Sequence, residues 1–136
     1  MRVVFDRNIF VSAFVIPGSL AERAILKIVE GKDVLLLSED ILDELLSVLS
    51  IKFSRDREEI SRVAVFLSEV AERVRTTGEI RVLRDEPDNR ILECAVSGKA
   101  DIIVTGDKEM LKVGIYSGTR IIGLNAYLRE WHPGPQ

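Results

Sequence analysis

Two stretches of the chain decide its fold: Val3-Val4-Phe5-Asp6 near the first residue, and Ile102-Ile103-Val104-Thr105-Gly106-Asp107 far along the sequence. Each is a short run of large apolar residues that ends in polar ones. A continuously apolar run of this length is typical of a strand that is buried on both faces. Such strands need helices on both sides, so the two stretches predict the interior of a parallel sheet.

The rest of the chain alternates further apolar runs with amphipathic ones. Strands are also predicted over residues 34–37, 80–83 and 120–123. Helices are predicted over residues 20–30, 39–50, 57–75, 88–96 and 125–131, with a single helical turn at 108–111. Parallel strands joined by right-handed helical crossovers form a sheet that is covered on both faces. We therefore expect the α/β class, as a three-layer α/β/α sandwich with a five-stranded parallel sheet.

The length of 136 residues suits one compact domain. We expect that domain to span residues 1–131, followed by a flexible tail over residues 132–136. The single cysteine, Cys94, excludes an internal disulfide and a cysteine-rich zinc site, and it favours a reducing cytoplasm. No apolar run is long enough to span a membrane, so we expect no membrane partner.

The polar residues that directly follow the predicted strands are mostly acidic. Asp6 follows the first strand, Asp85 and Asp88 follow the third, and Asp107 follows the fourth. Glu44 lies in the helix after the second strand. Ligands of open parallel sheets bind beyond the carboxyl ends of the strands, where the strand order reverses. We therefore expect these carboxylates to converge at the edge of the sheet where function is found.

Carboxylates that converge repel one another unless a cation neutralises them. Ligands that are all oxygen favour Mg²⁺ or Mn²⁺ over zinc. Mg²⁺ keeps part of its water shell and commonly takes a substrate phosphate as a further ligand. One such ion, or two about 4 Å apart, can activate a water molecule and stabilise a leaving oxygen. The pattern indicates chemistry at a phosphodiester, and the net charge of −3 restricts nucleic-acid binding to local basic patches.

Each acid also has a purely structural interpretation. Asp88 could be the N-cap of the helix that follows it, and Asp107 could cap the turn at 108–111. Glu44 could be a solvated helix residue, and helical periodicity separates it only slightly from Asp43. Asp6 is the hardest to dismiss, because it ends an apolar strand. The joint placement of the acids supports a site better than any single one does.

Four segments, within roughly residues 2–128, resemble the PIN-domain family in order and spacing. An apolar strand that runs into Asp-Arg-Asn and a short apolar helix, at Val4–Ala13, resembles the opening of PIN domains. Ser38–Leu45 resembles the helix that carries the family's Glu. Asp85–Ala95 and Ala100–Lys108 resemble its third and fourth acidic motifs.

The resemblance implies a magnesium- or manganese-dependent endoribonuclease that cuts RNA. It places the catalytic and metal-binding quartet on Asp6, Glu44, Asp88 and Asp107. It thereby selects Glu44 over Asp43, and Asp88 over Asp85. It also implies parallel strands in the order 3-2-1-4-5, with the first and fourth acids side by side. The subgroup it most resembles, the VapC-like toxins of toxin–antitoxin pairs, implies a cognate antitoxin as partner.

Further residues match supporting positions of the family. Asn8 matches an Asn that braces the first acid, and Thr105 matches a hydroxyl that supports the fourth. Glu93 and Asp101 match positions that are often acidic. Two basic side chains near the expected site are candidates for steering RNA, namely Arg84 and Arg90.

Arg7 departs from the family pattern, which usually has Thr or Ser at this position. An arginine could form an ion pair with Asp6 and replace part of the metal's charge, which would weaken metal binding. It could instead turn outward and hold an RNA phosphate with two hydrogen bonds. This residue keeps open an alternative function, that of a non-catalytic module that binds RNA or protein.

Two other readings of the strand-end acids fit less well. A phosphoacceptor domain needs adjacent acids after the first strand and a Lys after the fifth strand. A haloacid-type phosphatase needs Asp-x-Asp after the first strand. The chain has Asp-Arg-Asn after the first strand and Gly-Leu after the fifth.

The helix at 57–75 has a broad apolar face, and part of this face is expected to form a homodimer or antitoxin surface. The residues of this apolar face are Ile60, Val63, Ala64, Phe66, Leu67, Val70, Ala71 and Val74.

Overall fold

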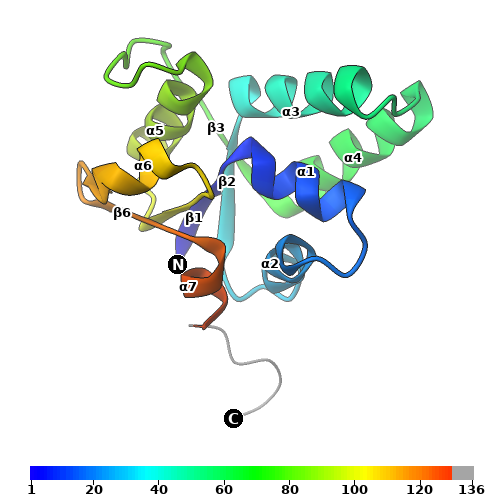
Figure 1. The fold of residues 1–136 in the computed structure, drawn as a ribbon, viewed down its shortest axis with the longest axis horizontal. Helices are drawn as coiled ribbons and strands as arrows, with labels where there is room; N and C mark the ends of the chain where they lie inside the picture. Colours follow the sequence, from blue (N-terminus) through cyan, green and yellow to red (C-terminus); the bar gives the residue numbers. More distant parts are fainter. Residues whose placement is uncertain (130–136) are drawn as a thin grey trace.

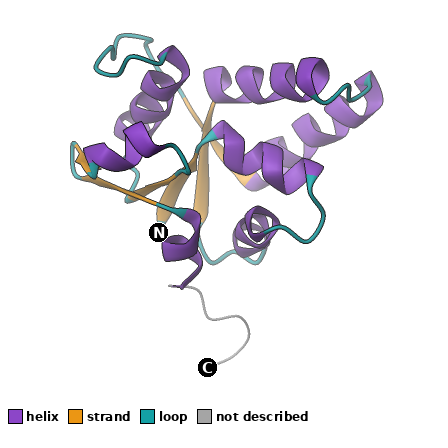
Figure 2. Ribbon diagram, viewed as in Figure 1, coloured by secondary structure: helices purple, strands orange, loops and turns teal. Residues whose placement is uncertain are grey.

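The computed structural model describes residues 1–129 (Figure 1). The last two residues of the helix predicted at 125–131 and the predicted tail at 132–136 lie outside the described residues. One or two helices separate successive strands, except that β6 directly follows β5 (Figure 2). The strands are β1 (Arg2–Phe5), β2 (Val34–Ser38), β3 (Ala71–Val74), β4 (Ile102–Val104), β5 (Ile115–Tyr116) and β6 (Thr119–Ile122). The helices are α1 (Arg7–Val15), α2 (Leu20–Val29), α3 (Glu39–Lys52), α4 (Arg57–Val70), α5 (Glu86–Gly98), α6 (Lys108–Val113) and α7 (Leu124–Arg129).

The strands form one six-stranded sheet in the order β3-β2-β1-β4-β6-β5. Neighbouring strands from β3 to β6 are parallel, and β5 pairs antiparallel with β6. The predicted order is therefore confirmed for the parallel strands, with the hairpin strand β5 added at one edge. The order reverses between β1 and β4, which pair through Val3–Ile102 and Phe5–Val104. The carboxyl ends of these two central strands lie side by side.

The predicted strand at 80–83 is wrong, and the third strand is β3, directly after α4. The predicted helix at 57–75 continued through this strand because Ala71 and Val74 extend its apolar period. β3 is an edge strand with two exposed residues, Glu72 and Arg73, so it lacks the continuous apolar run that marks a central strand. Pairing of its backbone with β2 makes it a strand, and only the tertiary structure supplies that partner.

Helices cover both faces of the sheet. On one face, the Phe5 ring lies 5.7 Å from the rings of Phe10 in α1 and Tyr127 in α7, measured between centroids. On the opposite face, α5 packs so closely that a Cβ on Gly98 would lie 2.9 Å from Leu36 and 3.0 Å from Val74. This is the expected three-layer α/β/α arrangement, with the apolar strands β1, β2 and β4 at its centre.

Local signals set the ends of several helices as expected. Ser38 caps α3 by accepting a hydrogen bond from the amide of Ile41, and Gly31 follows α2 with a φ of +76°. Within the described residues, no single helix has both the length and the apolar character needed to cross a membrane. By those criteria α1 and α2 qualify only as a pair, which is bent by 101°.

Candidate metal centre

Thr105 joins the ends of the two central strands. Its hydroxyl donates a hydrogen bond of 2.7 Å to Oδ2 of Asp6, and its Oγ1 accepts one of 3.0 Å from the amide of Asp107. The amide of Asp6 in turn donates to the carbonyl of Val104 at 3.0 Å. Asp6 is buried and also caps α1, where it accepts from the backbone amide of Asn8 at 3.3 Å. The first and fourth acidic segments are thus linked by one hydroxyl group.

Three carboxylates gather beside this link. Asp85, Asp88 and Asp107 each offer an oxygen atom, and these atoms lie within 4.8 Å of one another. Asp88 does not cap a helix, because α5 begins at Glu86 and Asp85 occupies the N-cap position. Asp85 and Asp88 are one helical turn apart, which places both at the same end of α5. The sequence analysis had placed Asp85 among the acids that follow strands, and the family resemblance then selected Asp88 in its place.

The surroundings of Asp88 make its negative charge unfavourable. Burial, the charge of Asp107 and a hydrogen bond with it, and the charges of Asp85 and Asp6 raise the pKa of Asp88 from 3.8 to about 7. The carboxyl group therefore retains a proton near neutral pH unless a cation replaces it. Donor atoms that are all carboxylate oxygens fit Mg²⁺ or Mn²⁺. The residues present thus match the kind of ion that the sequence predicts.

Glu44 lies apart from these three acids and pairs with Arg7. Nη1 of Arg7, in the first turn of α1, is 2.7 Å from Oε1 of Glu44 on α3. The sequence had suggested Asp6 or an RNA phosphate as the partner of Arg7, and the ion pair in the structure is with Glu44 instead. Asp43, the neighbour that periodicity could not separate from Glu44, is more exposed. Within residues 1–129, Glu44 therefore has an ion-pair partner and Asp43 has none.

Two hollows open from the acidic residues. The first lies between the starts of α1, α3 and α5, and it is lined by Asp6, Arg7, Asp40, Ile41, Asp43, Glu44, Glu86, Pro87, Arg90 and Ile91. The second is lined by Leu83, Arg84, Asp85, Asp88, Asp107 and Glu109. Asp6 and Glu44 thus face one opening, while the three clustered carboxylates face the other. Both openings lie at the carboxyl edge of the sheet, where ligands of such folds bind.

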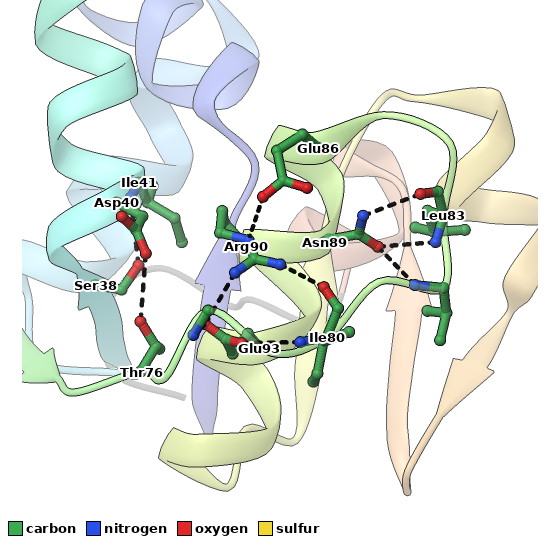
Figure 3. A network of polar contacts seen from close by, with 12 residues as sticks. Ser38, Asp40, Ile41, Thr76, Ile80, Leu83, Glu86, Asn89, Arg90 and Glu93 are labelled. Carbon is green, nitrogen blue, oxygen red and sulfur yellow. Dashed lines mark hydrogen bonds and ion pairs between the residues drawn. The ribbon is translucent and has the colours of Figure 1, made fainter.

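The two arginines proposed to steer RNA differ in their freedom. Arg84 is exposed at the second hollow. Arg90 is half-buried, and its guanidinium lies 3.2 Å from Glu86 and 3.4 Å from Glu93 (Figure 3). It also donates a hydrogen bond to the carbonyl of Ile80. The guanidinium of Arg90 is therefore bound to groups of the protein itself, whereas the exposed Arg84 can contact a ligand.

Glu93 and Asp101, expected near the site, lie elsewhere. Glu93 is buried on α5 and accepts hydrogen bonds from the amides of Gly78 at 2.7 Å and Ile80 at 3.2 Å, so it holds the loop between β3 and α5 (Figure 3). Asp101 accepts from the amide of Arg2 at 2.8 Å. Arg2 begins β1, so Asp101 lies at the edge of the sheet opposite the acidic centre.

Fold and centre together define a class of protein. It is a three-layer α/β domain whose carboxylates, at the switch point of a parallel sheet, form a candidate site for a divalent cation. The sequence model of the PIN domain matches residues 2–109, and the chain belongs to the PIN-domain family.

The chain is also similar to one curated protein and to chains of two solved structures. The uncharacterized protein MJ1680 from Methanocaldococcus jannaschii is 32% identical over 117 residues, which cover 83% of this chain and 75% of that protein. The fold is similar to a chain of VapBC2 from Rickettsia felis bound to a DNA fragment from their promoter, with a TM-score of 0.68, 20% identity and coverage of 90% of this chain and 98% of that one. It is also similar to a chain of VapBC-1 from nontypeable Haemophilus influenzae, with a TM-score of 0.60, 19% identity and coverage of 92% and 99%.

Proposed function

We propose that this protein is a metal-dependent endoribonuclease that acts as the toxin of a toxin–antitoxin pair in the cytoplasm. The observation that carries the proposal is the convergence of Asp85, Asp88 and Asp107 within 4.8 Å, beside the buried Asp6. Membership of the PIN-domain family and the fold shared with VapBC chains support it.

In this proposal the clustered carboxylates hold the ion. Asp85, Asp88 and Asp107 are its ligands, and Asp6 is the fourth acid of the centre. When bound, Mg²⁺ or Mn²⁺ would polarise a phosphoryl oxygen and lower the pKa of water at the site. Thr105 fixes the orientation of Asp6 through its hydrogen bond, so that the carboxylate need not reorganise when RNA arrives.

The RNA would be guided by local basic side chains rather than by the surface as a whole, because the chain has a net charge of −3. Arg84 is exposed beside Asp85 and can contact a phosphate at the second hollow. Arg7 and Glu44 line the first hollow, which also reaches Asp6. An RNA strand that passes over both hollows would place one phosphodiester at the acidic centre.

The partner surface that we propose is the outer face of α4, for a second copy of the chain and for an antitoxin. Leu67 of this helix is buried, and Ile60, Val63 and Phe66 are half-buried against the core. Val65, on the outer side, is 57% exposed. The Phe66 ring meets Phe14 of α1 edge-on, with 6.0 Å between centroids. An apolar helix face left half-exposed by its own domain is typical of a surface that a partner covers.

The test is cleavage of a mixed RNA substrate by the purified protein with Mn²⁺ or Mg²⁺. We expect cleavage to stop with a chelator and to fall by about 100-fold or more in Asp6→Asn and Asp88→Asn, since even the outer partners of a metal site are worth 10–100-fold. Glu30→Gln, which removes an exposed carboxylate at the end of α2 that lines neither hollow, should cleave normally. RNA binding without cleavage under any metal would favour the non-catalytic module instead.

A further inference from the structure

The Arg7–Glu44 pair bears on how many ions the acidic centre accepts. We propose that Arg7 is a built-in counter-charge for Glu44, so that the centre takes one divalent cation, at Asp85, Asp88 and Asp107, and no second one beside Glu44. This inference rests on the proposed function, because it concerns the same acidic centre.

The acids of the centre fall into two groups. Three of them place ligand atoms within 4.8 Å of one another, which is a spacing that a single ion can bridge. Asp6 and Glu44 face the first hollow, which Asp40, Asp43, Glu86 and two arginines also line. Arg90 is already balanced by Glu86 and Glu93, which both lie within ion-pair distance of it. Arg7 is therefore the cation of this hollow that neutralises Glu44.

The position of Arg7 is set by the backbone rather than by a flexible loop. It is the first residue of α1, directly after Asp6, whose side chain caps that helix. The guanidinium reaches Glu44 on α3, and the Arg7 and Glu44 side chains are 23% and 40% exposed, so the pair is only partly shielded from water. A guanidinium stays protonated at all relevant pH values, and its hydrogen bond to a carboxylate is charge-assisted. The counter-charge is therefore permanent.

A divalent cation at Glu44 would have to displace this guanidinium or lie next to it. Either arrangement is unfavourable, because like charges in a half-buried hollow repel strongly. A Thr or Ser, which PIN domains usually have at this position, would leave the Glu44 carboxylate free for a cation. The guanidinium of Arg7 thus neutralises Glu44 in place of a second cation.

Metal stoichiometry tests the proposal without reference to catalysis. Metal-free protein is titrated with Mn²⁺ by calorimetry, and the bound ion is examined by electron paramagnetic resonance. We expect one Mn²⁺ per chain in the wild type, with the spectrum of an isolated ion. Arg7→Thr should bind two per chain. Arg7→Lys keeps a positive charge and should bind one.

Further variants make the outcome decisive. In Arg7→Thr/Glu44→Gln the stoichiometry should return to one, which would assign the second ion to Glu44. Arg62→Thr removes a surface arginine paired with Glu58 and should bind one ion, like the wild type. Two ions in the wild type, or one in a folded Arg7→Thr, would overturn the inference and leave the proposed nuclease intact. Absence of any Mn²⁺ binding would overturn the proposed metal centre, and the inference with it.

Discussion

At the scale of single residues, the acidic centre depends on a hydroxyl group. Thr105 is buried, and it bonds at once to the carboxylate of Asp6 and the amide of Asp107. The two acids come from segments that lie far apart in the sequence. Pairing of β1 with β4 brings those segments together, and Thr105 then sets the orientation of the side chain of Asp6.

Replacing Thr105 with Val should damage the centre while keeping its shape. The change leaves an oxygen of Asp6 and the amide of Asp107 without their partner, which costs about 1–3 kcal/mol of the free energy of unfolding. Thr105→Ser keeps the hydroxyl and should retain most of the stability. Chemical denaturation measures the difference. A Val variant as stable as the wild type would show that water or another group replaces the hydroxyl.

The raised pKa of Asp88 predicts how stability depends on pH without metal. Between about 3.8 and about 7 the folded chain holds a proton on Asp88 that the unfolded chain has released. The unfolded state then binds fewer protons, so the free energy of unfolding falls as pH rises through this window. We expect the Tm of the metal-free protein to drop from pH 5 to pH 8, and Mg²⁺ to restore it.

Asp88→Asn should remove most of this pH dependence and raise the Tm at pH 8 in the presence of a chelator. Asp33 and Glu93 have lowered pKa values, so their contributions are lost only below about pH 4.5 and do not interfere. Asp43→Asn controls for the loss of one exposed acid and should keep the wild-type slope. An unchanged slope in Asp88→Asn would mean that another group carries the proton.

At the scale of elements, α5 carries both the site and the support for it. Asp88 projects toward the acidic cluster, while Asn89, Arg90 and Glu93 hold the loop between β3 and α5 (Figure 3). The side chain of Asn89 accepts hydrogen bonds from the amides of Val82 at 3.1 Å and Leu83 at 2.8 Å. It also donates one to the carbonyl of Leu83 at 2.9 Å. The loop ends at Asp85, so these contacts also position a proposed ligand.

Asn89→Ala should loosen this loop and weaken the metal site together. Losing the buried partner of several backbone groups costs about 1–3 kcal/mol. Hydrogen exchange of the amides of Val82 and Leu83 should accelerate, while exchange in β1 and β4 stays slow. The affinity for Mn²⁺ should fall because Asp85 loses its fixed position. Equal exchange rates in wild type and variant would contradict this role.

Glu86→Gln is the matched control for the loop. Glu86 is largely exposed and pairs with Arg90 from the outside. Exposed ion pairs contribute about 1 kcal/mol or less, so this change should alter neither the exchange of the loop nor its stability by much.

At the scale of the whole molecule, the sheet places its acidic edge and its apolar helical surface on different parts of the domain. The acids lie at the carboxyl ends of β1 and β4, while the exposed apolar residue of α4, Val65, lies outside the core against which Ile60, Val63 and Phe66 pack. Catalysis and association can therefore be changed separately by mutation. That separation makes the proposed dimer testable without disturbing the metal centre.

Val65→Glu should convert the proposed homodimer to a monomer. Val65 lies on α4 with 57% of its surface exposed, so a charge there costs the folded monomer little but would be buried in a dimer. Sedimentation analysis at several concentrations measures the change. Val29→Glu, at a position on α2 with 51% exposure, should leave the assembly unchanged. A monomeric wild type would refute the proposed dimer directly.

The sequence by itself determined the class of fold, the central strands and most of the acids. Strands such as β1 and β4 are apolar on both faces, and that pattern is local and unambiguous. Helix caps such as Ser38 are local as well. The parallel strand order followed from the family resemblance rather than from any local signal.

Only the tertiary structure decided features that depend on distant partners. β3 is a strand because β2 pairs with it, although its residues continue the apolar pattern of α4. Residues 80–83 have the apolar character of a strand, but they form a loop whose backbone is hydrogen-bonded to Asn89 and Arg90 of α5. Asp85 joins the acidic cluster, and Arg7 takes Glu44 rather than Asp6. Which ion pair a charged side chain forms depends on the distances that the tertiary fold sets between segments far apart in the sequence. The sequence does not specify those distances locally.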